Sequence, residues 1–497
     1  MFERSAGVLL HPTSLPSRFG IGDLGQNAYK FVDFLEESKQ KLWQVLPLGP
    51  TSFGDSPYQC LSAFAGNPLL ISFEKIVEDG IASESILDDV PLFDENFVEY
   101  GDVIEYKFEV LNEVFDQFKK NKSKEIENKF LRFRQEEKYW LDDYCLFVAI
   151  KDYFDGKPWN EWNNDIACRK ENALNHYKDI LKKEIEFHRF IQFLFFEQWN
   201  ELKAYANSKG IKIIGDLPIF VAFDSSDVWV HRNLFEVTDD GKPLYIAGVP
   251  PDYFSPTGQR WGNPHYKWDV MEKDDYHWWR ERIKSLLKVS DIIRIDHFRG
   301  FYNYWKIDGD APTAEKGEWV LGPGEKFFFT LEKYFGKLPI IAEDLGLLVE
   351  EVYKLRDKFD FPGMKILQFA FGTNGEKKFL PHNYTRNCVV YTGSHDNDTT
   401  LGWWNSIQNN DTDEKEFFLI YSGSDGKDIV RDMIRLAYSS VADIVIIPMQ
   451  DLLRLGSEAR MNFPGKPSGN WMWRFQWEQI SQNLINELKT FVEVFER

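Results

Sequence analysis

Four short segments of this chain end an apolar run with acidic residues. They are Gly215-Asp216-Leu217-Pro218, Arg294-Ile295-Asp296-His297-Phe298, Ala342-Glu343-Asp344-Leu345 and Ser394-His395-Asp396-Asn397-Asp398. A carboxylate at the C-terminal end of a buried parallel strand has no role in packing, whereas that rim of a (β/α)8 barrel is where catalytic groups lie. Four such segments on one rim predict chemistry that needs several carboxylates in one place.

Asp296 and Glu343 form the sharpest pair. Cleavage of a glycosidic bond with retention needs a nucleophilic carboxylate and, about 5–5.5 Å away, a second carboxyl that acts as acid and base. Arg294 lies two residues before Asp296 and so on the same face of the strand, where its charge would keep Asp296 ionised. Glu343 would need a raised pKa to hold a proton for the leaving oxygen. For either motif alone, a structural ion pair or an isolated rim acid is the simpler interpretation.

His395 and Asp396 follow another apolar run, and two interpretations of them are open. Asp396 could hold sugar hydroxyls in the distorted ring of the transition state, with His395 as a donor beside it. Alternatively, Asp296, His297, His395 and Asp396 could ligate a divalent ion, as in metal-dependent barrel hydrolases. Because the sequence has no His-x-His or similar ligand cluster, we expect a sugar site and no metal.

Eight apolar runs without polar alternation are typical of parallel strands buried on both faces. They are Gly7–Leu10, Leu42–Leu46, Ile211–Ile214, Ile292–Ile295, Ile340–Ala342, Met364–Phe369, Cys388–Tyr391 and Asp443–Ile447. Helical patterns occur between many of them, at Ala28–Leu35, Trp278–Leu287, Glu350–Phe359 and Asp428–Ala437. Alternating strands and helices predict βαβ units. Eight units favour a closed (β/α)8 TIM barrel, with an open doubly wound sheet as the alternative.

Two long stretches interrupt this alternation. Residues 51–205 are largely helical in pattern and predict an inserted helical subdomain on the C-terminal rim of the barrel. Residues 220–275 form a second insertion, whose part at 248–264 is punctuated by Pro and Gly. We expect 248–264 to be an active-site loop that carries Phe254 and Trp261. A surface loop packed on its own side chains is the alternative. Together these features predict one barrel catalytic domain over residues 1–497.

The composition excludes several classes of partner. There are 59 Lys and Arg against 79 Asp and Glu, a net charge of -20, which disfavours nucleic acid and anionic membranes. Four widely spaced cysteines fit a reducing compartment better than a zinc site or disulfides. The sequence has neither a signal-peptide pattern at its start nor an apolar run of membrane-spanning length. We therefore expect a cytoplasmic protein.

Two turn-like motifs have ambiguous roles. Gly20-Ile21-Gly22-Asp23-Leu24-Gly25 matches the dinucleotide fingerprint, but Pro12, Pro16 and a polar loop separate it from the first strand. We expect a turn there and no cofactor. Gly54-Asp55-Ser56-Pro57-Tyr58-Gln59 is either a plain turn or supplies Tyr58 as a stacking platform at the mouth of the barrel.

Long motifs along nearly the whole chain resemble the amylomaltase family, the 4-α-glucanotransferases or disproportionating enzymes of the α-amylase superfamily. The motifs are Leu10-His11-Pro12-Thr13-Ser14-Leu15-Pro16, Trp43 to Pro50, Gly54 to Tyr58, Gly215 to Val221, the 248–264 loop, Arg294 to Phe298, Ala342 to Gly346 and Ser394 to Asn397. The resemblance runs from the first strand to about Trp471. It implies an α-amylase-like barrel without a C-terminal β-domain.

The same resemblance implies roles for individual residues. Asp296 would be the nucleophile, Glu343 the acid and base, and Asp396 the stabiliser of the transition state. The implied substrate-binding residues are Ser56, Tyr58, Asp216, Phe254, Trp261, Arg294, His297, His395 and Asn462. Many members of the family carry Tyr at a remote second glucan site where this chain has Phe53, so a site at Phe53 and Tyr100 would keep a stacking face without that hydroxyl.

The sequence therefore predicts a cytoplasmic 4-α-glucanotransferase that needs no cofactor. It would move α-1,4-glucan segments between glucans or maltooligosaccharides by a retaining double displacement, as a monomer or weak homo-oligomer. An α-glucan hydrolase using the same residues is the nearest alternative. A non-catalytic starch-binding scaffold and a metal-dependent hydrolase are more distant ones.

Overall fold

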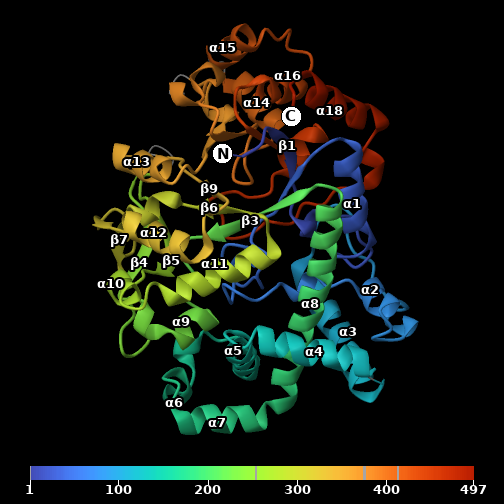
Figure 1. Ribbon diagram of the computed structural model, residues 1–497, viewed down its shortest axis with the longest axis vertical. Helices are drawn as coiled ribbons and strands as arrows, with labels where there is room; N and C mark the ends of the chain where they lie inside the picture. Colours follow the sequence, from blue (N-terminus) through green and yellow to red (C-terminus); the bar gives the residue numbers. More distant parts are fainter. Residues whose placement is uncertain (1, 122, 252–254, 347, 373–375, 411–412) are drawn as a thin grey trace.

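The computed structural model describes every residue except 1, 122, 252–254, 347, 373–375 and 411–412. Eight parallel strands close into a barrel in the order β1-β12-β11-β10-β9-β6-β3-β2 (Figure 1). Their bounds are β1 Ser5–Leu9, β2 Leu42–Gln44, β3 Lys212–Pro218, β6 Ile292–Asp296, β9 Ile340–Ala342, β10 Gly363–Ile366, β11 Cys388–Tyr391 and β12 Ile444–Pro448. Each overlaps one of the eight predicted runs, so the predicted barrel is confirmed and the open sheet was the wrong alternative.

Eighteen α-helices lie in the described part of the chain. They are α1 Gln26–Glu37, α2 Phe73–Glu78, α3 Tyr100–Asn121, α4 Lys124–Glu136, α5 Leu141–Tyr153, α6 Asn164–Ala167, α7 Glu171–Ile180, α8 Lys182–Ser208, α9 Ser226–Val230, α10 Trp268–Glu272, α11 His277–Val289, α12 Gly324–Phe335, α13 Glu350–Lys358, α14 Thr400–Asn410, α15 Asp413–Ser422, α16 Ile429–Ser439, α17 Met449–Leu452 and α18 Gln482–Val494. The four predicted helical patterns correspond to α1, α11, α13 and α16, which begin or end within one or two residues of the expected bounds.

The second half of the barrel illustrates how local sequence sets these elements. In α16 the side chain of Asp428 accepts a hydrogen bond from the backbone N–H of Arg431 and so caps the helix. Val430, Met433 and Ile434 are buried on one side of that helix, as its 3.6-residue period requires. In β12 all five residues are buried, as in a strand covered on both faces.

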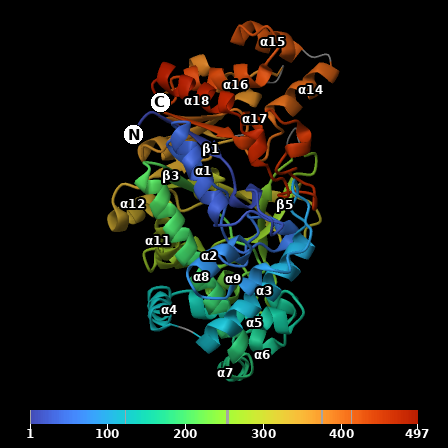
Figure 2. The ribbon, with the colours of Figure 1, turned by 90° about the vertical axis from the view of Figure 1, so that its right-hand side faces the viewer.

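The segment between β2 and β3 is helical, as expected. Helices α2 to α7 form a lobe below the barrel in Figure 1, and α8 leads from that lobe up along the barrel beside α1 (Figures 1 and 2). The expected end of the insertion at residue 205 falls inside α8, which continues to Ser208. The lobe and the barrel thus share one continuous helix.

A four-stranded antiparallel sheet stands beside the barrel, in the order β5-β4-β7-β8. Its strands are β4 Tyr245–Val249, β5 Gln259–Pro264, β7 Asn303–Asp308 and β8 Gly317–Leu321. The sequence predicted an insertion with an active-site loop here and no strands. The segment 220–275 supplies β4 and β5 as well as a loop, and β4 pairs with β7 from beyond β6.

The glycine-rich motif after β1 serves packing. A Cβ on Gly22 would lie 2.0 Å from the carbonyl oxygen of Pro12, and Gly20 has a φ of +80°. Gly22 is therefore needed for the close approach to the preceding loop, and Gly20 for its left-handed backbone. The turn leads into α1, as expected from the sequence.

Candidate active site

Three of the four acidic motifs meet because the strands that carry them are neighbours. Strands β3, β6 and β9 lie side by side, and their registers place Asp216 opposite Arg294 and Ile295 opposite Ala342. Arg294 is 3% exposed, and its Nη1 donates to both carboxylate oxygens of Asp216 at 2.8 and 2.7 Å. Its Nη2 donates to Asp296 Oδ1 at 2.9 Å. Although burial opposes the charge, Asp216 and Asp296 together raise the pKa of Arg294 well above its ordinary value. A permanent cation thus lies against Asp296.

Glu343 follows β9 and faces the residue after Asp296. His297 has a left-handed backbone with φ 51°, and its N–H donates to Glu343 Oε2 at 2.7 Å. The N–H of Leu345 donates to Glu343 Oε1 at 2.8 Å. Burial, and next the negative charge of Asp296, raise the pKa of Glu343 to about 8, although Arg294 and the two N–H groups act in the opposite direction. Glu343 therefore holds a proton at neutral pH beside a carboxylate that is paired with a guanidinium.

Tyr58 reaches this cluster from the turn after β2. Its hydroxyl donates to Asp216 Oδ2 at 2.8 Å, and its ring stacks on His395 with centroids 5.0 Å apart at 18°. Ser56 supports the turn, because its Oγ accepts the N–H of Tyr58 at 3.2 Å. Burial and the charge of Asp216 raise the pKa of Tyr58 well above 10, so the hydroxyl stays protonated as a donor. The sequence predicted a stacking ring here but not the bond to Asp216.

Asp396 lies on the loop that follows β11. Its side chain is 49% exposed, and its Oδ1 lies 3.4 Å from Nε2 of His395. Asn462, from the segment after β12, donates through Nδ2 to the same Oδ1 at 2.6 Å. The structure thus brings Asp396, His395 and Asn462 together.

Trp261 of β5 stands over the other side of the site. Its ring meets the imidazole of His297 edge to face at 4.9 Å and 89°. Its Nε1 donates to Gln259 Oε1 at 3.1 Å, which fixes the indole. Burial lowers the pKa of His297 to about 4, so this imidazole is neutral at pH 7. Phe254, the other aromatic residue predicted on this loop, lies outside the described residues.

Phe53 and Tyr100, the predicted second glucan site, differ in their exposure to solvent. Phe53 is 75% exposed, whereas Tyr100 is 7% exposed. The hydroxyl of Tyr100 donates to the carbonyl of Trp471 at 3.0 Å. Only Phe53 therefore offers a broad ring face to solvent, and the second glucan site remains a prediction.

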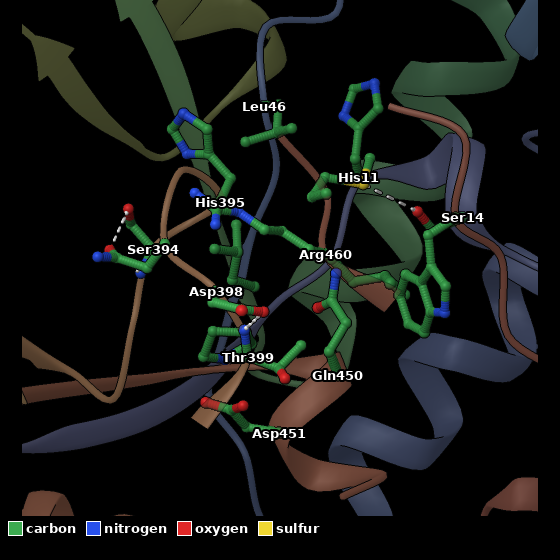
Figure 3. A pocket seen from close by; sticks show the side chains of 16 residues that line it. His11, Ser14, Leu46, Ser394, His395, Asp398, Thr399, Gln450, Asp451 and Arg460 are labelled. Carbon is green, nitrogen blue, oxygen red and sulfur yellow. Dashed lines mark hydrogen bonds between the residues drawn. The ribbon is translucent and has the colours of Figure 1, made fainter. Parts of the chain in front are cut away.

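A hollow opens next to His395, between the loops that follow β1, β11 and β12 (Figure 3). Polar groups from all three loops line it, among them His11, Asp398, Gln450 and Arg460. In Figure 3 the side chain of Arg460 extends across this hollow toward the 394–399 segment. Sequence reasoning had singled out Asn462 from this region and had missed Arg460.

Metal ligation was the competing interpretation of the His and Asp residues. Over the residues for which side chains are described, no group of three or more His, Cys, Asp or Glu is arranged to hold an ion. Of the candidate ligands, Asp296 is bonded to Arg294, and His395 lies between Tyr58 and Asp396. The donor set suits hydroxyl groups, which both donate and accept hydrogen bonds.

Known proteins resemble this chain over its whole length. A family model described as 4-alpha-glucanotransferase matches residues 10–480. The 4-alpha-glucanotransferase of Synechocystis sp. is 50% identical over 499 residues, covering 100% of this chain and 98% of that protein. The 4-alpha-glucanotransferase of Thermus thermophilus is 48% identical over 502 residues, covering 99% of each. Among solved structures, the amylomaltase from Streptococcus agalactiae in complex with acarbose has a TM-score of 0.96, with 42% identity and 100% coverage of both chains.

Proposed function

The chain belongs to the 4-alpha-glucanotransferase family, and on that premise we propose how its residues divide the transfer of an α-1,4-glucan segment from one chain to another. The observation that carries the assignment is the contrast between Asp296, paired with Arg294, and Glu343, whose pKa is raised to about 8. Two carboxyl groups kept in opposite protonation states are what a retaining mechanism needs.

In the first step Asp296 attacks the anomeric carbon of the donor glucan. An Asp296 Oδ–carbon bond forms, the glycosidic bond breaks, and Glu343 gives its proton to the departing oxygen. Asp396 accepts hydrogen bonds from hydroxyls of the distorted ring, and these bonds strengthen as the transition state is reached. Asp216, Tyr58 and Arg294 keep the nucleophile oriented through their shared hydrogen bonds.

In the second step the protonation state of Glu343 reverses. Once Asp296 is an ester it is neutral, so the second largest cause of the raised pKa of Glu343 is gone, while the charge of Arg294 remains. The pKa of Glu343 therefore falls after the first step. Its carboxylate can then take the proton of an acceptor's 4-hydroxyl as that oxygen attacks the anomeric carbon and releases Asp296.

Transfer requires that a glucan rather than water resolves the ester. We assign Trp261 of β5 and Phe254, both within residues 248–264, to the acceptor side, where an aromatic face orients a sugar ring. Ser56, His297, His395 and Asn462 are assigned to substrate binding around the same centre. A second glucan site at Phe53, with Tyr100 behind it, is the least supported part of this assignment.

The substrates are α-1,4-glucans and maltooligosaccharides, as both donor and acceptor, and the reaction uses no cofactor. No helix in the described part of the chain is both long and apolar enough to cross a membrane. We propose a cytoplasmic enzyme, monomeric or weakly oligomeric, whose net charge of -20 disfavours the binding of nucleic acid and anionic membranes. One barrel domain over residues 1–497 carries the insertions 51–205 and 220–275.

Incubation with maltotriose alone tests this function. A transferase makes both longer and shorter maltooligosaccharides, whereas a hydrolase makes only shorter products with a matching gain in reducing ends. Products resolved by length distinguish the two. Accumulation of shorter sugars alone would favour the hydrolase that uses the same residues, and loss of activity with a chelator would return the metal-dependent hydrolase to consideration.

A further inference from the structure

Asp396 is held by hydrogen bonds more than by packing. Because its side chain is 49% exposed, surrounding atoms do not confine its carboxylate. The loop that carries it is tied at several points to the segment after β12. Asp451 accepts hydrogen bonds from the hydroxyls of Thr392 and Thr400 at 2.5 and 2.7 Å, and Ser457 Oγ donates to Asp398 Oδ2 at 2.7 Å.

Arg460 joins the segment after β12 to the loop after β11 at Asp396 itself. Its Nη2 donates to the backbone carbonyl of Asp396 at 2.6 Å, and its Nε donates to the backbone carbonyl of Asn462 at 2.8 Å. The Asn462 amide then donates to Asp396 Oδ1 at 2.6 Å. The planar guanidinium thus fixes the distance between the main chains of Asp396 and Asn462, whose side chains are hydrogen-bonded to each other.

The guanidinium is itself kept in place. Its carbon lies 4.6 Å from the centre of the Phe463 ring, and the residue is partly buried between the two loops. Both acceptors of its hydrogen bonds are main-chain oxygens of residues in the candidate site. A lysine could offer one point charge there, but not two donors in a fixed plane.

We propose that Arg460 is a positioning residue that sets the orientation of Asp396 through its own bonds and through Asn462. This inference depends on the proposed role of Asp396. Arg460 acts on the transition state through another residue, so its loss should lower kcat more than it raises KM.

The test compares Arg460→Met with Arg454→Met in maltotriose disproportionation. Arg454 lies six residues earlier in the same segment, but it pairs with Glu487 and Asp428. We expect Arg460→Met to lower kcat by about tenfold or more, as for loss of bonds from a charged donor, with KM within about threefold. Arg454→Met should keep both constants near those of the unchanged enzyme. A kcat for Arg460→Met equal to that of the control, or a loss in KM alone, would overturn the inference.

Arg460→Lys keeps the charge and serves if Arg460→Met does not fold. It should recover only part of the activity, and full activity would show that the fork of donors is unnecessary. The variant Asp396→Asn distinguishes the proposed role of Asp396 from the proposed role of Arg460. Near-normal turnover of that variant would refute the role of Asp396, whereas an inactive Asp396→Asn beside a fully active Arg460→Met would refute only the role of Arg460.

Discussion

The stability of a Glu343→Gln variant, relative to that of the wild type, should increase with pH. Burial and the charge of Asp296 raise the pKa of Glu343 from 4.5 to about 8 in the folded chain. The folded protein therefore binds more protons than the unfolded one between these values. Its stability falls as pH rises through this window, because the buried carboxyl must either keep its proton or become a charge beside Asp296. Gln has the shape of the protonated acid and titrates nowhere in this range. Its NH2 group cannot accept one of the two backbone N–H bonds that Glu343 accepts, and this cost does not change with pH.

The size of the effect follows from the two pKa values. At pH 4 Glu343 is mostly protonated in both states, so the variant should differ from the wild type there only by the pH-independent cost of the lost N–H bond. At pH 7 the raised pKa of Glu343 lowers the free energy of unfolding of the wild type by about 3 kcal/mol relative to low pH. For 497 residues the unfolding entropy is roughly 1 kcal/mol per degree, so the melting temperature of the variant minus that of the wild type should increase by about 3 °C from pH 4 to pH 7.

The assay is thermal unfolding of both proteins at half-unit steps from pH 4 to 8.5. Glu109→Gln, on the exposed face of α3, controls for the loss of a carboxylate without a buried partner. A difference in melting temperature that stays constant with pH would contradict a raised pKa for Glu343. A difference that becomes less favourable to the variant as pH rises would contradict the electrostatic argument as a whole.

Four further outcomes test the chemistry. Asp296→Asn should keep glucan binding but lose turnover, since an amide forms no ester; near-normal transfer would refute the nucleophile. Glu343→Gln should fail on natural glucans yet form a covalent intermediate from a glucosyl fluoride, whose leaving group needs no proton, and mass spectrometry should detect that adduct. In the wild type, the rate of donor cleavage should decline as pH rises above about 8, when Glu343 loses its proton. Trp261→Ala and Phe254→Ala should each raise the ratio of hydrolysis to transfer about three- to tenfold, measured as free glucose against transfer products, and an unchanged ratio would leave the loop a structural one.

The barrel was predictable because its signal is local. Each of the eight strands is a short apolar run buried on both faces, and every run can be seen without knowing its neighbours. The carboxylates to which we assign catalysis were equally visible because they follow directly after such runs. Their convergence then required only the rule that parallel strands end at one rim.

The antiparallel sheet was missed because its strands lack a local signature. In β7, Tyr304 is buried in the main core, while Ile307 is buried in a separate small cluster with Ile246 and Ala314. Apolar residues thus face both sides of the strand, and the alternation that marks an antiparallel strand is absent. Its partner β4 lies on the far side of β6 in the sequence, so the pairing is a property of the folded chain.

Contacts between residues far apart in the sequence could not be predicted for the same reason. Tyr58 and Asp216 are 158 residues apart, and Arg460 and Asp396 are 64 apart. The sequence shows that each residue can form a bond, but it does not show with which partner. The burial of Tyr100 under Trp471 depends likewise on a segment from the other end of the chain.

Helix α8 connects the helical lobe rigidly to the barrel. Its first part packs on α4, α5 and α7 of the lobe, and it also contacts α1, β3 and α11 of the barrel. An unbroken helix of 27 residues is about 40 Å long and bends only gently unless Pro, Gly or an inserted group interrupts it, and none of its residues is Pro or Gly. Swinging the lobe against the barrel would require breaking helical hydrogen bonds, so no hinge lies at this junction. The lobe should lose its amide hydrogen-exchange protection together with the barrel, as one cooperative unit.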